Sequence, residues 1–293
     1  MSKIKQYHLH KENPEKLQFG VYDLETYLEN SGTHALKAHS HSYYQIIWIQ
    51  NTGGTHYIDF NGYPVKENSL FFINKNQIHY FDAEARHKGV LIHFNDSLFR
   101  PTDLDIFLKY QVFNNYERPS YCLKEASLTL INSYIDLINL ELNNENAFGY
   151  QEVIRSLVKS LLVILERVHN KENTSDVGLN HPYTNQYIQF KELIEEYYNQ
   201  NYKLAEYASI LNISTKTLTT ITKTMANTSP AALIAERIIL ETKRLLAFTS
   251  LKVNEVGYKL GFDDVSYFVK YFKRHMNQSP TEYRNLLEKT TNK

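Results

Sequence analysis

The most informative stretch of the sequence is VNEVGYKLGFDDVSYFVKYFKRHMNQSP, residues 253–280. Its apolar spacing predicts a short helix over 253–260, a tight turn and a second helix. Gly257 provides the small residue needed where two helices cross steeply, and Gly261 tolerates the positive φ of the turn. A carboxylate of Asp263 or Asp264 can cap the second helix. The pattern is typical of a helix-turn-helix.

The same pattern occurs about 50 residues earlier, where NTSP at 227–230 matches NQSP at 277–280. In this first copy Ala208 stands at the crossing and Asn212 at the turn. Asn is suited to that place because, after Gly, it best tolerates a left-handed conformation. Ser214 can cap the second helix. The internal repeat predicts two copies of one supersecondary unit.

A long helix is expected between the copies, with Ser229 as its cap and Pro230 at the first helical position. The helical pattern continues through Leu246. A connector of this size spans roughly 25 Å, so with its flanking turns it can hold two recognition helices about one 34 Å turn of DNA apart. One monomer could then contact two successive major grooves.

The second helix of each copy has an outer face with lysine and hydroxyl groups. In the later copy Phe268 and Phe272 lie four residues apart and are expected to face inward, which leaves the lysines outside. Such a face suits a major groove with phosphates at its rim. An ordinary solvated helix face is the alternative for one helix alone, and the repetition favours DNA binding.

Four segments together resemble the AraC/XylS-type bacterial transcription regulators: SPAALIAERI at 229–238, KRLL at 243–246, GFDDVSYFVKYFK at 261–273 and SPTEYR at 279–284. The resemblance covers about residues 185–286. It implies a seven-helix DNA-binding domain with two helix-turn-helix units, usually dimeric. It also implies action at promoters, often as an activator, with RNA polymerase as a partner in that case.

The resemblance also implies roles for single residues. Base-edge contacts would be made by Lys216, Thr219, Thr220, Val265, Ser266, Val269 and Lys270. Lys223 and Lys273 would contact phosphates. The sequence departs from the family at Thr222, where Phe is usual, and at Asn227 and Asn277, where Gly is usual.

Charge is unevenly distributed along the 293 residues, although the net charge is zero. Residues 1–181 carry a net charge of −4, and residues 182–293 carry +4. A positive C-terminal part fits an anionic partner. The single Cys122, the absence of a secretory signal at the start and the lack of a membrane-length apolar run lead us to expect a cytoplasmic protein with no membrane partner.

The first part of the sequence is expected to be mainly β. Four runs rich in Ile, Val, Phe and Tyr, at 43–49, 56–60, 69–73 and 90–94, are separated by turn signals, as in an antiparallel barrel or sandwich. From Lys124 the spacing becomes helical and predicts two amphipathic helices broken near 143–146. They can cover the barrel or pair with a second subunit.

We therefore predict an α+β multidomain protein. Residues 1–122 would form a cupin-like antiparallel β-barrel that senses an effector, and 123–170 a helical hairpin used for dimerisation. Residues 171–184, which are polar and contain Gly178 and Pro182, would form a linker. Residues 185–293 would form the all-α DNA-binding domain with two helix-turn-helix units.

The N-terminal part resembles a cupin barrel at Gly32, His39-Ser40-His41, Gln45, Gly62 and His79. Metal-binding cupins use a His-x-His pair, a Glu four residues on and a distant His, and here Gln45 replaces the Glu. We therefore expect no metal and no cofactor. We expect instead hydrogen-bonded histidines or an effector pocket lined by His39, His41, Trp48, His56 and His79.

Three functions compete at this point. The favoured one is a sequence-specific transcription regulator of double-stranded promoter DNA, acting as a homodimer under the control of a small molecule in the barrel. The second is a metal-dependent cupin enzyme, which leaves the repeated helix-turn-helix unexplained, so we expect no enzymatic activity. The third is a constitutive DNA-binding protein whose barrel serves only dimerisation.

Overall fold

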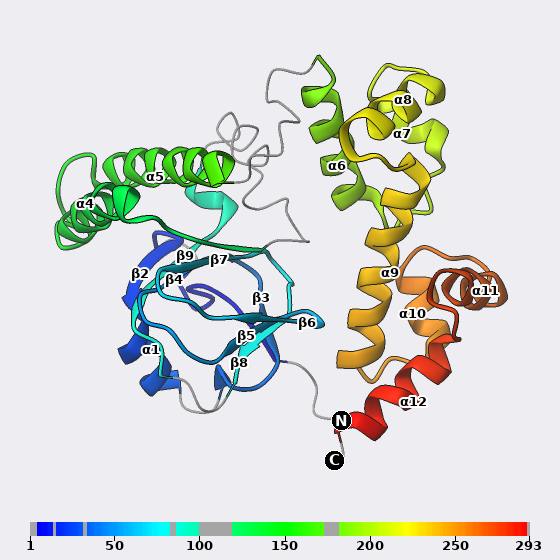
Figure 1. Cartoon of the computed structure of the whole chain (residues 1–293), viewed down its shortest axis with the longest axis horizontal. Helices are drawn as coiled ribbons and strands as arrows, with labels where there is room; N and C mark the ends of the chain where they lie inside the picture. The colour runs from blue at the N-terminus through cyan, green and yellow to red at the C-terminus, as the bar shows by residue number, and fades with distance from the viewer. Residues whose placement is uncertain are drawn as a thin grey trace. The chain divides into compact units, whose positions relative to one another are not determined.

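A computed structural model describes residues 5–13, 16–31, 34–82, 86–99, 119–172 and 182–291 (Figure 1). The chain divides into two compact units, with the boundary between Thr174 and Ser175. Each unit has hydrophobic clusters of its own, so each is described separately below.

The N-terminal unit contains two five-stranded sheets. The first has the order β1 (Lys5–Tyr7), β3 (His39–His41), β8 (His79–Phe81), β5 (Thr55–Ile58) and β6 (Asn61–Pro64). The second has the order β10 (Ser120–Cys122), β7 (Ser69–Ile73), β4 (Tyr44–Ile49), β9 (Gly89–Phe94) and β2 (Phe19–Asp23). Within the described strands, only the pair β1–β3 is parallel.

The prediction of a mainly antiparallel β domain followed by a helical hairpin is confirmed, but closure into a barrel is not seen in the described residues. The strands belong to two separate sheets with edge strands β1, β6, β10 and β2. Apolar side chains of both sheets form one core between them, among them Ile47 and Phe71 from the second sheet and Ile58 and Phe81 from the first. This is how a sandwich buries its inner faces.

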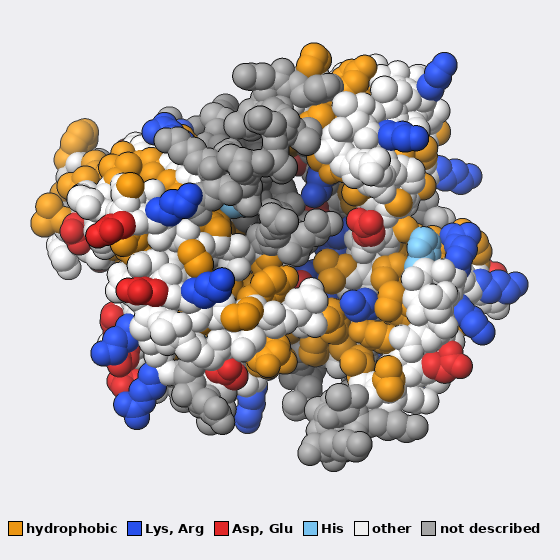
Figure 2. Space-filling view, in the orientation of Figure 1, with side chains coloured by type: hydrophobic (Ala, Val, Ile, Leu, Met, Phe, Trp, Pro, Cys, Tyr) orange, Lys and Arg blue, Asp and Glu red, His pale blue; other side chains and the backbone are white. Residues whose placement is uncertain are grey.

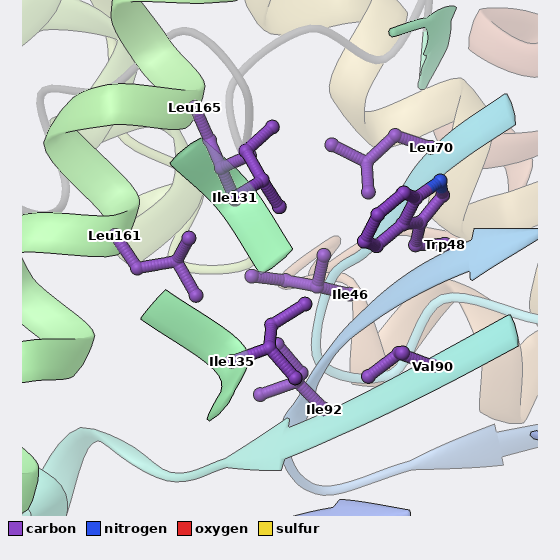
Figure 3. Close-up of a pocket in the computed structure, with 9 residues that line it drawn as sticks. All are labelled: Ile46, Trp48, Leu70, Val90, Ile92, Ile131, Ile135, Leu161 and Leu165. Carbon is purple, nitrogen blue, oxygen red and sulfur yellow. The ribbon is translucent and has the colours of Figure 1, made fainter. Parts of the chain in front are cut away.

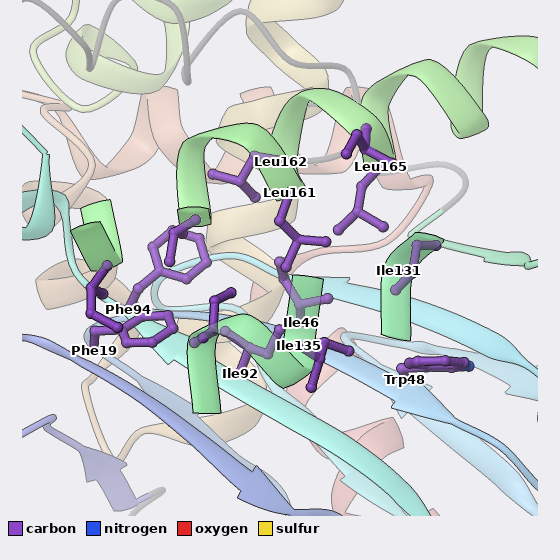
Figure 4. Packing of buried hydrophobic residues seen from close by; sticks show 14 of the residues in the cluster. Phe19, Ile46, Trp48, Ile92, Phe94, Ile131, Ile135, Leu161, Leu162 and Leu165 are labelled. Carbon is purple, nitrogen blue, oxygen red and sulfur yellow. The ribbon is translucent and has the colours of Figure 1, made fainter. Parts of the chain in front are cut away.

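Strand β4 contributes to two cores because successive side chains on a strand point to opposite faces. Ile47 and Ile49 lie in the core between the sheets. Ile46 and Trp48 lie in a larger core on the other face of the second sheet, against the helical hairpin (Figure 4). The unit therefore has three layers, with the second sheet in the middle.

The hairpin consists of α4 (Glu125–Leu142) and α5 (Tyr150–Glu172), with the break where the sequence predicts it. Its inner face carries Ile131, Ile135 and Ile138 from α4, at the spacing of an amphipathic helix. Helix α1 (Leu24–Ser31) and a 3₁₀ turn, η2 (Asp96–Leu98), complete the unit. The helical structure of α5 continues into the start of the expected linker, most of which lies outside the described residues.

Seven helices make up the described part of the C-terminal unit: α6 (Thr184–Tyr197), α7 (Leu204–Ile210), α8 (Thr215–Ala226), α9 (Pro230–Phe248), α10 (Val253–Lys259), α11 (Val265–Met276) and α12 (Pro280–Thr291). One core surrounds Tyr207 and Leu218, and a second surrounds Phe268 and Phe272. Helix α9 supplies side chains to both and runs from one helix-turn-helix to the other (Figure 1). None of the described helices has both the length and the apolar composition needed to span a bilayer.

Candidate nucleic-acid interface and buried histidine site

The first helix-turn-helix is formed by α7 and α8. Ala208 is buried at the crossing, and Asn212 adopts a φ of 53° at the turn. The hydroxyl of Ser214 accepts a hydrogen bond from the Thr217 N–H at 3.0 Å, which caps α8. The local roles predicted for these three residues are therefore confirmed.

The second helix-turn-helix, α10 and α11, has the same construction with tighter packing. Gly261 has a φ of +82°, and a Cβ atom on Gly257 would come within 3.0 Å of the Phe268 ring. Of the two candidate caps, Asp264 caps α11 by accepting from the Ser266 N–H at 2.8 Å. Gly257 thus allows α10 to lie directly against the buried face of α11.

Both recognition helices end in the same way. Asn227 and Asn277 adopt left-handed conformations, with φ of 51° and 56°, and their N–H groups bond to the carbonyls of Lys223 and Lys273. Asn at these places therefore takes the conformation that Gly takes in the family pattern. A feature that was not predicted stands at the start of each unit: Glu206 and Glu255 accept from the backbone N–H of the residue three positions earlier. The repeated Lys-x-x-Glu at 203–206 and 252–255 was its signal.

The outer face of α8 carries the four residues predicted there. Lys216, Thr219, Thr220 and Lys223 are all exposed, opposite the buried Leu218. The Thr219 and Thr220 hydroxyls donate to the carbonyls one turn back, at 2.8 and 3.1 Å. Each hydroxyl proton is thereby used inside the helix, so these side chains offer an acceptor and a methyl group to a base edge.

On α11 the structure separates the predicted residues into two groups. Ser266, Lys270 and Lys273 are exposed, whereas Val265 and Val269 are half-buried, and Val269 packs on the core. Figure 2 shows Lys and Arg side chains gathered over this helix. The valines therefore offer less surface to DNA than the polar residues.

Two further side chains of α11 belong to the same surface and were not among the predicted contacts. Tyr267 is 53% exposed, and Arg274 is exposed with its guanidinium 5.4 Å from the centre of the Tyr271 ring. An aromatic residue in a helix usually indicates core, which is why Tyr267 was not selected from the sequence.

The connector α9 is held by an ion-pair network. Arg237 bonds to Glu195 of α6 at 2.8 Å and to Glu241 at 3.1 Å, and it lies 4.0 Å above the Tyr198 ring. Arg244 also bonds to Glu241, at 3.2 Å. At 1.5 Å per residue the 19 residues of α9 span about 28 Å. The network stiffens α9, which joins the two helix-turn-helix units.

A second candidate site lies between the sheets of the N-terminal unit. His39 and His41 lie two apart on β3, so they point to one side, and His79 is paired with His39 across β3 and β8. The ring centre of His79 lies 4.4 Å from that of His39 and 5.0 Å from that of His41. The three histidines predicted to meet are brought together and buried.

Other polar groups surround these rings. His56 Nε2 lies 3.1 Å from His79 Nδ1, and the Gln45 amide donates to His93 Nε2 at 2.8 Å. Burial lowers the pKa of His41, His56 and His79 well below the usual value and that of His93 to about 3. The cluster is therefore uncharged at neutral pH. His93 was missed because only the β4–β9 register brings it to Gln45.

Trp48 does not belong to this cluster, which corrects the predicted pocket. It lies on the opposite face of β4, beside Ile46, and its indole packs under the hairpin near Ile131 and Leu165 (Figure 3). The physical reason is the two-residue alternation of β4, which places Gln45 between the sheets and Trp48 on the helical side. His56 does join the histidines, as predicted.

The space beside the histidines is small. A cavity of about 20 Å³ is lined by His39, Gln45 and His79, and also by Leu24, Tyr27 and Leu28 of α1. Such a volume holds about one water molecule or one ion. An organic ligand would have to displace side chains to enter.

Comparison with known proteins gives two family matches. Residues 21–157 match the family model of the AraC-like ligand binding domain, and residues 207–286 match a helix-turn-helix domain. The first runs from within β2 to the first turns of α5, and the second runs from within α7 to within α12.

Relatives share both parts. The transcriptional activator RhaR of Mannheimia succiniciproducens is 21% identical over 249 residues, 84% of this chain and 86% of its own length. The activator RhaS of an Enterobacter species is 22% identical over 85% of this chain and 88% of its own. Among solved structures, ToxT of Vibrio cholerae superposes with a TM-score of 0.39 at 16% identity, over 92% of this chain and 98% of its own.

The ligand-binding match coincides with the unit that holds the histidine cluster, and the helix-turn-helix match coincides with the repeat that carries the exposed lysines. The chain belongs to the AraC/XylS-type family of DNA-binding transcription regulators.

Proposed function

We propose that this regulator binds promoter DNA as a homodimer, with α8 and α11 of each chain in successive major grooves. The observation that supports this most strongly is the repeated unit with exposed Lys216 and Lys270 on equivalent faces, joined by the stiffened α9. Contact with promoter DNA implies action in the cytoplasm. No catalytic role is part of the proposal.

Within this interface the exposed side chains supply base contacts, in particular Lys216, Thr219 and Thr220 on α8 and Ser266 and Lys270 on α11. The half-buried Val265 and Val269 can supply apolar contact to a thymine methyl group. Lys223 and Lys273 stand in the last turns of their helices and are assigned to phosphates.

Dimerisation is assigned to the hairpin. Its outer surface exposes Leu130, Leu137 and Leu140 on α4 and Val153 and Val163 on α5. Leu130 and Leu137 are seven apart, so they lie on one stripe of the helix. An apolar stripe of this kind is typical of a helix that packs against a second subunit.

The space between the sheets is assigned to the effector. Its lining of histidine and glutamine provides hydrogen bonds, and entry of a ligand would move α1 or the strands. A ligand that binds one arrangement more tightly shifts the population toward it. Since the relatives RhaR and RhaS are named as activators, we propose activation, with RNA polymerase as the further partner.

Selection of duplexes from a random pool with the purified chain tests the proposal. We expect two conserved boxes whose centres lie about 10 base pairs apart, because two helices on one face must contact successive grooves. Lys270→Ala should relax the preference in one box only, with a loss of about 1–3 kcal/mol at that position. Selection of a single box, or an unchanged preference in the variant, would contradict the assignment. Repeating the assay with candidate metabolites tests effector control.

Lys273→Ala is expected to weaken binding to all duplexes to a similar degree. A lysine that contacts a phosphate releases a counterion, so its loss should reduce the slope of log affinity against log salt by about 1. Fluorescence anisotropy over a series of salt concentrations measures this slope. Lys66→Ala removes the same charge from the exposed surface of the N-terminal unit and serves as the control. Equal slopes for Lys273→Ala and the native chain would reject the phosphate contact.

A further inference from the structure

The histidine cluster contains buried polar atoms that have no hydrogen-bond partner among the described residues. They are both ring nitrogens of His41, Nε2 of His79 and Oε1 of Gln45. These three side chains are 2 to 3% exposed. Buried polar groups in folded proteins are nearly always partnered. Several buried lone pairs without a partner in one place indicate a bound electron-pair acceptor, such as a cation.

The geometry fits a single ion. One ring nitrogen from each of His39, His41 and His79 can be chosen so that all three lie within 4.8 Å of one another. Tetrahedral Zn²⁺ with bonds near 2.0 Å places ligand nitrogens about 3.4 Å apart, so small side-chain rotations complete the set. The cavity lined by His39, Gln45 and His79 has room for an ion.

One of the three rings is already oriented as a ligand, and a second can take the same orientation through its tautomer. His39 Nδ1 donates to the Lys37 carbonyl at 2.8 Å, which leaves the lone pair on Nε2. His79 Nδ1 lies 3.1 Å from His56 Nε2, so a proton on His79 Nδ1 again leaves Nε2 as the ligand atom. Metal-binding histidines almost always donate their second N–H to such an acceptor. The ion would fill this cavity of about 20 Å³, so the proposed effector would have to bind beside it by moving α1 or the strands.

The types of ligand atom indicate which metal ion would bind. Three neutral imidazoles and one amide oxygen suit Zn²⁺ and other first-row divalent ions, whereas Mg²⁺ and Ca²⁺ prefer sets of oxygen ligands. We propose that His39, His41 and His79, with Gln45 as the fourth ligand, bind one divalent first-row transition-metal ion between the two sheets. This revises the expectation from sequence that the Gln makes a metal site unfavourable.

The test uses the full-length chain, stripped with a chelator and then dialysed. Titration with Zn²⁺ by calorimetry is expected to show one ion per chain. Binding should also raise the unfolding temperature of the N-terminal unit, because the ion binds the folded state. Co²⁺ used as a spectroscopic probe should give the visible absorption of a tetrahedral site with three nitrogen ligands and one oxygen ligand. No DNA is needed, so the outcome is independent of the proposed DNA binding.

Variants distinguish the site from surface binding. His41→Gln should weaken Zn²⁺ binding by roughly 100-fold or more, since the loss of a ligand exceeds the 10- to 100-fold effect of outer partners. His34→Gln removes an exposed histidine of the same unit and should leave binding unchanged. Gln45→Glu adds an anionic ligand and should tighten binding by at least about tenfold, a gain that misfolding cannot imitate. Absence of Zn²⁺ binding by the native chain, or equal affinity in native, His41→Gln and Gln45→Glu chains, overturns the proposal.

Discussion

Gly261→Ala is expected to cost the C-terminal unit about 3 kcal/mol of folding free energy. The residue has a φ of +82°, which is unfavourable for alanine by about 1 kcal/mol. A Cβ atom there would also lie 2.3 Å from the Asn199 carbonyl oxygen, and this is backbone that cannot rotate away. The turn between α10 and α11 or the segment after α6 must move.

Calorimetry of the full-length chain measures the effect, which corresponds to a fall of roughly 10–20 °C in the melting temperature of a unit of this size. Asn212→Gly is the matched control, because it places glycine at the equivalent turn, where φ is 53°. It should change stability by no more than about 0.5 kcal/mol. A loss for Gly261→Ala as small as that of the control would show that the turn can relax.

Gly89→Ala is expected to destabilise the N-terminal unit by about 4 kcal/mol or more. Gly89 begins β9 with a φ of +147° and is paired with Ile49 of β4. A Cβ atom would stand only 1.9 Å from the Trp48 carbonyl oxygen, so the two central strands of the second sheet would have to separate.

Gly53→Ala measures the cost in folding free energy of a positive φ alone, without a steric clash. Gly53 also has a positive φ, +124°, but no atom lies within 4 Å of the place that a Cβ atom would take, so we expect a loss of about 1–2 kcal/mol. Chemical denaturation followed by tryptophan fluorescence measures both variants. Trp48 is the only tryptophan in the chain and lies in the core of this unit, so its emission reports on this unit. Similar losses for both variants would show that the contact with the Trp48 carbonyl is relieved at little cost.

The C-terminal unit was the more predictable part because its signals are local. Caps, turns and helix crossings are decided by residues within a few positions of one another, as at Ser214, Asn212 and Gly257. The ion pair of Arg237 with Glu195 was not predicted, because it joins residues of two helices that are 42 positions apart in sequence and leaves no periodic trace.

The N-terminal unit shows what local patterns leave undetermined. Alternation along β4 predicts a strand with two different faces, but which face meets the histidines depends on the pairing of distant strands. Trp48 was therefore assigned to the wrong side, and His93 was not selected. The separation into two sheets follows from the same long-range pairing.

Strand β4 separates two hydrophobic cores, one between the sheets and one under the helical hairpin. Gln45 and Ile47 project into one, Ile46 and Trp48 into the other, and no flexible segment separates them. If a ligand beside Gln45 displaces the backbone of β4, the side chains on its opposite face, which pack against α4 and α5, must move as well. A ligand between the sheets can therefore move the helical hairpin through β4, without contacting the hairpin directly.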